Sequence, residues 1–423
     1  MNAIRHCDKK TLFLKKINEM NFEKIRFENA NGYELSGRLE LPVNRAPHNY
    51  AIFAHCFTCG KNFSATKNIS RALTTAGYGV LRFDFTGLGD SDGDFADTNF
   101  SGNVEDLLAA VDYLKTNYKA PSLLIGHSLG GAAAIFASAK ASSIKAIATI
   151  GAPSDTKHVR HLFGDQLTAI TENGQATVEL SGRSFHIKEQ FLKDLNEQQV
   201  TKTLKELRKP ILIAHSPQDQ TVGIAHAEKL YHAALHPKSF VSLDGADHLL
   251  MKKKDSEYIG QLIASWASRY VEQDEDNKLK TTNQVAASLD HEEGFATQIV
   301  TGKHHFTADE PESAGGTNYG PTPYDLLSSG LAACTVMTVQ MYAKRKKWNI
   351  KNIECHVNYD QQHATDGKNC EEDAAKIDTF TREIKVTGDL DDKQINRILQ
   401  IANKCPVHKT LHSETQVITK LIT

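Results

Sequence analysis

The stretch Ile125-Gly126-His127-Ser128-Leu129-Gly130-Gly131 places a serine in the pattern G-x-S-x-G. An apolar run over residues 122–125 precedes it, and a helix-forming run over residues 131–141 follows it. We therefore predict a strand, a sharp turn at the serine and a helix. Such a turn strains the backbone and crowds the helix against the strand, which is why glycines stand two residues before and two after the serine. This arrangement predicts that Ser128 is a nucleophile.

Strand and helix patterns alternate on both sides of this turn. Alternation of this kind is typical of an α/β fold, in which a doubly wound and mostly parallel sheet carries helices on both faces. The strands are predicted at residues 23–28, 34–41, 50–54, 79–83, 122–125, 146–150, 211–214 and 239–243.

The chain of 423 residues is longer than one hydrophobic core usually supports, so it indicates more than one domain. A polar stretch over residues 272–284 predicts a linker. It separates an extension (1–21) and a first domain (22–271) from a second domain (285–423). In the second domain, extended runs surround one long apolar helix from Tyr324 to about Lys344, which predicts an α+β arrangement. These runs cover residues 296–308, 350–359, 379–386 and 415–422.

Positive and negative side chains nearly balance, with Lys+Arg 49 against Asp+Glu 51 and a formal net charge of -2. This balance argues against a nucleic-acid partner or an anionic membrane surface and favours a small-molecule substrate. No run approaches the roughly 18 uncharged apolar residues of a membrane-spanning helix. The seven cysteines are odd in number and lack the spacing of a disulfide framework, so the thiols are expected to be reduced or used chemically. We predict a cytoplasmic protein.

An acid and a base are predicted to accompany the serine. A serine hydroxyl needs a base to remove its proton, and the base needs a carboxylate to fix its tautomer. Asp219 follows the strand predicted at 211–214, and His248 follows the strand that ends at Leu243. Both therefore lie at the carboxyl edge of the sheet with Ser128, where open α/β sheets bind ligands. Asp155 is the competing acid.

The segment His55-Cys56-Phe57-Thr58-Cys59-Gly60 follows the strand predicted at 50–54. A backbone N–H at this place can complete an oxyanion hole, so the amides of Phe57 and Leu129 are the predicted donors. Cys56 and Cys59 also form a C-x-x-C pair, but no second pair of zinc ligands lies nearby in the sequence. We therefore expect neither a metal nor a cofactor. A lesser alternative is that Cys56 is oxidised and gates the site.

Taken together, residues 22–271 resemble the α/β-hydrolase family, in its small-acyl esterase and dienelactone-hydrolase-like branches. The glycine-rich loop over residues 84–93 is part of the resemblance. The resemblance implies hydrolysis of an ester, thioester or amide through an acyl-enzyme. The expected partner is a small-molecule acyl substrate.

A second pair of cysteines lies in the second domain. Cys334 falls within the long apolar helix, where a thiol is by default an inert part of the core. Cys405 precedes Pro406, a residue suited to the first turn of a helix, and the N–H donors of that turn favour a thiolate. The residues alone do not decide between a structural and a chemical role for the pair.

Residues 285–423 resemble the OsmC/Ohr family of thiol-dependent peroxidases. The resemblance implies that Cys334 attacks an organic hydroperoxide, that Cys405 resolves the product as a disulfide and that a dithiol reductant restores the pair. It also implies an intertwined homodimer in which the two long helices pack together. The chain departs from the peroxidase branches in two ways: Tyr324 stands where they carry a glutamate, and no arginine lies between Arg269 and Arg345.

Three alternatives to peroxidase activity stay open for the second domain: redox sensing, ligand binding and dimerisation without chemistry. A scaffold role for the whole chain is the rival of a different class. It would leave the first domain with its fold but without its reaction.

Overall fold

The computed structural model describes residues 22–42, 46–56, 59–164, 166–180, 183–272, 279–289, 294–363 and 376–421. The chain divides into two compact units between Glu293 and Gly294. The predicted extension 1–21 and residues 273–278 of the predicted linker lie outside the described residues.

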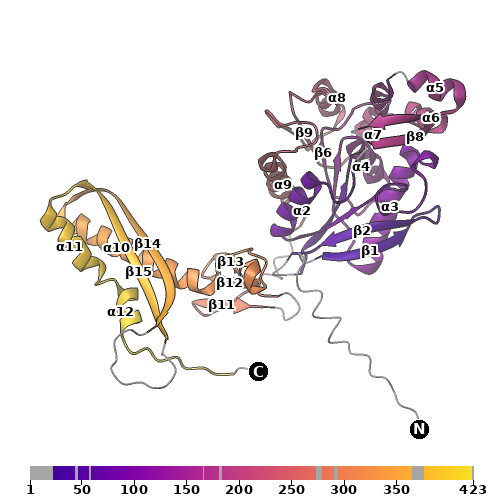
Figure 1. Cartoon of the computed structure of the whole chain (residues 1–423). Helices are drawn as coiled ribbons and strands as arrows, with labels where there is room; N and C mark the ends of the chain where they lie inside the picture. Colours follow the sequence, from indigo (N-terminus) through magenta and orange to yellow (C-terminus); the bar gives the residue numbers. More distant parts are fainter. Residues whose placement is uncertain are drawn as a thin grey trace, which may run out of the picture. The chain divides into compact units, whose positions relative to one another are not determined.

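An eight-stranded sheet forms the centre of the first unit (Figure 1). Its strand order is β1-β2-β4-β3-β5-β6-β9-β10. All neighbours from β4 to β10 are parallel, while β1 and β2 form an antiparallel edge. The predicted α/β class with a mostly parallel sheet is confirmed. The strands are β1 (Phe22–Glu28), β2 (Glu34–Glu40), β3 (Asn49–Ala54), β4 (Tyr78–Phe83), β5 (Leu123–His127), β6 (Ala146–Ile150), β9 (Ile211–His215) and β10 (Lys238–Ser242).

Two hydrophobic cores cover the two faces of this sheet. Side chains alternate between the faces of a strand. Accordingly, Ile52 of β3 belongs to the core under α3 and α4, and its neighbour Phe53 belongs to the core under α2 and α9. Burying each such side chain stabilises the fold by about 1.5–3 kcal/mol. The covering helices are α2 (Ser64–Thr75), α3 (Phe100–Asn117), α4 (Leu129–Lys140) and α9 (Lys253–Ala267).

The remaining elements of the first unit are shorter. A hairpin of β7 and β8 packs on η1 through an edge contact of Phe185 with Phe95, whose ring centroids lie 5.2 Å apart. These elements are η1 (Phe95–Asp97), η2 (Thr156–Phe163), α5 (Gln166–Asn173), β7 (Gln175–Leu180), β8 (Arg183–Lys188), α6 (Glu189–Glu197), α7 (Val200–Glu206) and α8 (Ala225–Ala233).

The second unit is built on the helix α10 (Pro323–Lys346). Thr322 and Asp325 form a reciprocal capping box at its start, and Pro323 takes the first helical position. The helix lies along the long antiparallel hairpin of β14 and β15 (Figure 1). The predicted α+β class is confirmed. The other elements are β14 (Asn349–His363), β15 (Lys376–Asp389), α11 (Asp392–Ala402) and α12 (Pro406–His412).

Two of the extended runs predicted for the second domain differ in the structure. Residues 296–308 form two strands, β12 (Thr297–Thr301) and β13 (His304–Ala308), because Gly302 turns the chain with φ +56°. Together with β11 (Val285–Ser288) they make a three-stranded sheet. The strand predicted at 415–422 is wrong for the described residues 415–421, where Val417 and Ile418 are exposed. Apolar spacing alone does not make a strand unless a sheet edge is there to pair with it.

Among the described helices, α10 alone has the length and hydropathy of a membrane span. No membrane-spanning helix is predicted from the sequence, because only uninterrupted apolar runs are considered there. The central helix of a soluble domain meets the same criterion. Within the chain, α10 buries Leu331, Val339 and Ala343, whereas Met337 and Met341 are 62% and 73% exposed.

Candidate active site

Ser128 lies at the sharp turn between β5 and α4. Its backbone has φ 55° and ψ -128°, which is strained for a residue other than glycine and costs about 1–3 kcal/mol. Its N–H donates to the carbonyl of Ile150 at 2.8 Å and fixes the turn. A Cβ on Gly126 would lie 2.3 Å from the carbonyl oxygen of Gly130, and one on Gly130 would lie 2.4 Å from that of His55. Any side chain at position 126 or 130 would clash with the backbone, so both positions require glycine.

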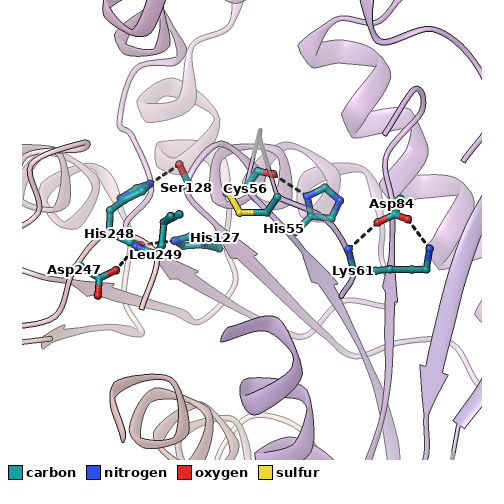
Figure 2. The surroundings of a disulfide bond; sticks show 10 residues. His55, Cys56, Lys61, Asp84, His127, Ser128, Asp247, His248 and Leu249 are labelled. Atoms are coloured by element: carbon teal, nitrogen blue, oxygen red, sulfur yellow. Dashed lines mark hydrogen bonds and ion pairs between the residues drawn. A yellow bond between two sulfur atoms is a disulfide. The ribbon is translucent and has the colours of Figure 1, made fainter. Parts of the chain in front are cut away.

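The three predicted side chains meet at the carboxyl edge of the sheet, and Figure 2 shows His248 pointing at Ser128. The Nε2 atom of His248 lies 3.0 Å from Oγ of Ser128, and its Nδ1 atom lies 2.7 Å from Oδ2 of Asp219. A neutral imidazole donates from one nitrogen and accepts at the other. Because a carboxylate only accepts, Nδ1 donates to Asp219 and leaves the lone pair of Nε2 toward the serine hydroxyl.

Asp219 is held in place by its own loop. Its Oδ1 atom accepts the backbone N–H groups of Thr221 and Val222, each at 2.8 Å. Burial by itself raises the pKa of Asp219, but the hydrogen bonds from His248, Val222 and Thr221 and the charge of His248 outweigh it. The net pKa lies below the ordinary value, so the carboxylate is ionised at neutral pH.

The other acids near these loops shape turns instead. Asp155 caps η2 and accepts the N–H of Lys157 at 2.9 Å. Asp247 accepts the N–H of Leu249 at 2.9 Å. Asp155, the competing acid, is thus held by a local turn, and the structure brings Asp219 to the histidine.

His127 is a part of this site that the sequence does not predict, apart from its place directly before the serine. It is buried, and its Nε2 atom donates to the backbone carbonyl of His248 at 2.7 Å (Figure 2). Burial lowers the pKa of His127 to about 3, helped by the nearby charge of His248. The imidazole is therefore neutral, and it ties the strand end at Ser128 to the loop that carries the base.

The predicted oxyanion donors are only partly placed. Leu129 is the first residue of α4, where the N–H has no partner within the helix. Phe57 lies outside the described residues.

The cysteines on either side of Phe57 in the sequence, Cys56 and Cys59, form a disulfide. Just beyond, the backbone N–H of Lys61 donates to Asp84 at 2.7 Å, and its buried ammonium ion-pairs with the same carboxylate (Figure 2).

The structure also brings together the two predicted cysteines of the second domain. Cys405 is buried at the start of α12 and accepts the N–H of His408 at 3.5 Å, while Cys334 is half-buried on α10. Burial raises the pKa of Cys405, but hydrogen bonds from the Cys334 side chain and the His408 N–H outweigh it and lower the pKa below its usual value.

Arg382 of β15 lies near the two cysteines, although it falls outside the interval from Arg269 to Arg345 in which the resemblance places an arginine. One Nη atom donates to Oγ1 of Thr335, the neighbour of Cys334, at 2.8 Å. The other donates to Asn403 at 2.7 Å. Arg382 thus places a cation next to residues that adjoin the two cysteines, because Thr335 follows Cys334 and Asn403 lies two residues before Cys405. The arginine comes from a strand that follows the helix in sequence but lies beside it in space.

Tyr324, which stands in the place of the family glutamate, has a different environment. Its ring stacks on Tyr359 of β14 with centroids 4.1 Å apart and an interplanar angle of 12°. Asp325 is occupied in the capping box of α10. In the peroxidase branches that the domain resembles, the glutamate holds an arginine against the reactive sulfur, and neither Tyr324 nor Asp325 is placed for that role.

Fold and site together define a hydrolase of the α/β class joined to a thiol-bearing domain. A family model described as serine aminopeptidase, S33, matches residues 51–178, and one described as OsmC-like protein matches residues 315–420. The crystal structure of the esterase domain from a Rhodothermus marinus protein is 52% identical, with a TM-score of 0.51; the match covers 60% of this chain and 100% of that one. The chain belongs to the α/β-hydrolase family in its first domain, and residues 315–420 of its second match the model of the OsmC-like family.

Two curated proteins are more distant relatives of the first domain. Palmitoyl-protein thioesterase ABHD10 of Rattus norvegicus is 26% identical over 211 residues, which are 48% of this chain and 67% of that protein. The uncharacterized protein YfhR of Escherichia coli O157:H7 is 23% identical over 232 residues, which are 54% of this chain and 73% of that protein.

Proposed function

We propose that the first domain is a serine hydrolase that cleaves esters and thioesters of small acyl groups through an acyl-enzyme. The observation that carries this proposal is the pair of contacts at His248, 3.0 Å to Ser128 and 2.7 Å to Asp219. These contacts satisfy the geometry that a general base and its orienting acid require.

In this mechanism His248 takes the proton of Ser128 as Oγ attacks the acyl carbon. The imidazolium that forms is stabilised by Asp219 and then protonates the leaving group. The N–H groups of Leu129 and Phe57 donate hydrogen bonds to the carbonyl oxygen as negative charge develops on it, a contribution of about 10²–10³ in rate. Water, activated by the same histidine, then releases the acid.

The choice of esters and thioesters over amides has two supports. The relative from Rhodothermus marinus is called an esterase domain, and the rat relative is called a thioesterase. Both kinds of substrate have leaving groups that need less help from an acid than an amine does.

A fluorophosphonate probe tests the nucleophile directly. We expect one phosphonyl adduct per chain on Ser128, located by mass spectrometry of the digested protein, because only an activated serine attacks such a probe. Prior denaturation is the control and should abolish labelling. A folded chain that stays unlabelled would support the scaffold role instead.

We infer as a second activity that the OsmC-like domain reduces organic hydroperoxides with a dithiol. In this reaction one thiolate of the pair attacks a peroxide oxygen, the alcohol leaves, and a sulfenic acid forms. The second thiol condenses with it to give a Cys334–Cys405 disulfide and water, and the dithiol returns both thiols. Cys334 is half-buried and Cys405 is buried beside it, which supports Cys334 as the thiol that meets the peroxide and Cys405 as the thiol that resolves the sulfenic acid.

Replacement of Arg382 tests this activity. We expect Arg382→Met to slow formation of the Cys334–Cys405 disulfide under an organic hydroperoxide by about tenfold, equivalent to one pKa unit in thiolate stability. Quenched time points analysed by mass spectrometry measure the rate. Arg397→Met is the matched control, since that arginine bonds to Tyr342 and Gln400. Absence of any disulfide in the unmodified chain would favour dimerisation through the exposed face of α10.

A further inference from the structure

Three donor side chains lie together behind the nucleophile. The sulfur atoms of Cys56 and Cys59 and a ring nitrogen of His127 all lie within 4.8 Å of one another. All three residues are buried. The cysteines follow β3, and His127 ends β5, the parallel neighbour of β3. Figure 2 shows the disulfide at Cys56 beside His127. The sheet thus brings a histidine to a C-x-x-C pair from 68 to 71 residues away in the sequence, which spacing alone does not predict.

The hydrogen bond of His127 leaves one nitrogen available as a ligand. Nε2 faces a backbone carbonyl at 2.7 Å, and a carbonyl only accepts, so Nε2 carries the proton. The lone pair then lies on Nδ1. Histidines that bind metals have this same arrangement, in which the second ring N–H is donated to a carbonyl or carboxylate that fixes the ring.

The cysteine pair is suited to both a disulfide and a metal. Its Cα atoms lie 5.2 Å apart, and the structure holds the pair as a disulfide. Zn²⁺ takes Cys sulfur at about 2.3 Å and His nitrogen at about 2.0–2.1 Å, so tetrahedral ligands are about 3.5–3.8 Å apart. Once the S–S bond is broken, rotation of the cysteine side chains can reach these separations within the 4.8 Å cluster.

We propose that Cys56, Cys59 and His127 form a site for one Zn²⁺ ion when the cysteines are reduced, and that the disulfide is the metal-free form of the same site. A dithiol reductant converts the disulfide into two thiols and is itself oxidised to a disulfide. Zn²⁺ then displaces the two thiol protons. Two thiolates balance the charge of the ion, so the buried site carries no net charge and avoids the cost of an unpaired ion.

This site gives the loop after β3 a cross-link in either redox state. The far end of the loop is already fixed by the buried ion pair of Lys61 with Asp84. At the near end, the disulfide joins Cys56 to Cys59, and the metal would in addition join both cysteines to His127 at the end of β5. The proposal revises the sequence expectation that no metal is bound.

The test measures zinc binding to the full chain reduced with a phosphine, which does not itself bind the ion through thiols. Cys334→Ser/Cys405→Ser is the parent variant, because it removes the thiol pair of the second domain. We expect the reduced parent to hold about one more Zn²⁺ per chain than the same chain with Cys59→Ser added. Cys355→Ser in the parent is the matched control and should lose none. His127→Gln should weaken binding by about 100-fold or more, beyond the 10–100-fold loss typical of an outer-shell partner.

Spectroscopy with Co²⁺ provides a second readout that does not depend on a variant's folding. The reduced parent should show the charge-transfer absorption of cobalt bound to thiolates, and oxidation of the parent to the disulfide should remove it. Equal zinc content in the reduced parent and a folded Cys59→Ser chain overturns the proposal. So does a cobalt spectrum without thiolate absorption.

Discussion

Ser128→Ala is expected to lower kcat/KM for short p-nitrophenyl esters by about 10⁴-fold or more, because it removes the atom that forms the acyl-enzyme. Only background hydrolysis and the oxyanion donors would remain. The substitution deletes one hydroxyl at a position whose backbone is held by Ile150, so the far-UV circular dichroism spectrum and the melting temperature should change little. Rates are measured with several acyl lengths and leaving groups side by side for both chains.

A control substitution at a second serine shows whether the loss of activity is specific to Ser128. Ser142 is exposed just after the end of α4, and Ser142→Ala should retain full activity. If Ser128→Ala were as active as the unmodified chain on every substrate of the panel, the acyl-enzyme mechanism would have to be abandoned, and the domain would fit the scaffold role better.

Asp219→Asn is expected to lower kcat by about 10⁴-fold while leaving the fold intact. The reason lies in the two oxygens of the carboxylate. Oδ1 accepts the N–H groups of Thr221 and Val222, so the carbonyl oxygen of an asparagine must take that place. Its NH₂ group then faces Nδ1 of His248 and forces the proton onto Nε2. A protonated Nε2 cannot accept the proton of Ser128.

The same measurement distinguishes the acids. Asp155→Asn is the control, since Asp155 only caps η2 and should be replaceable at little cost in rate. Steady-state kinetics across a pH range should show the loss for Asp219→Asn at every pH. Large loss in Asp155→Asn with little loss in Asp219→Asn would reverse the assignment.

Much of the first domain could be predicted because its signals are local. The central strands of the main sheet appear as short apolar runs, and the strands toward its edges, β1, β2 and β10, mix polar and apolar residues. The predicted ends differ from the observed ends by no more than two residues, as with residues 122–125 against Leu123–His127. The turn at Ser128 is also local, since its two glycines are demanded by contacts within β5, α4 and the end of β3. Ser128, Asp219 and His248 could be found because each follows its own strand.

The contacts that could not be predicted join residues far apart in the sequence. His127 meets the carbonyl of His248, and Arg382 meets Thr335, without any spacing that relates the partners. The run 415–422 was predicted as a strand from its apolar spacing, but a strand needs a free edge in the right place, which only the tertiary structure can provide.

The bond between His127 and the carbonyl of His248 has a consequence for how this hydrolase can vary. His127 is also the residue directly before Ser128 in the chain. Its hydrogen bond to the backbone of His248 therefore sets the distance between the residue that carries the attacking oxygen and the residue that activates it. A substitution at His127 alters how closely the two reacting groups approach, although neither of them is replaced. Turnover in related chains can therefore diverge through a side chain that never touches the substrate.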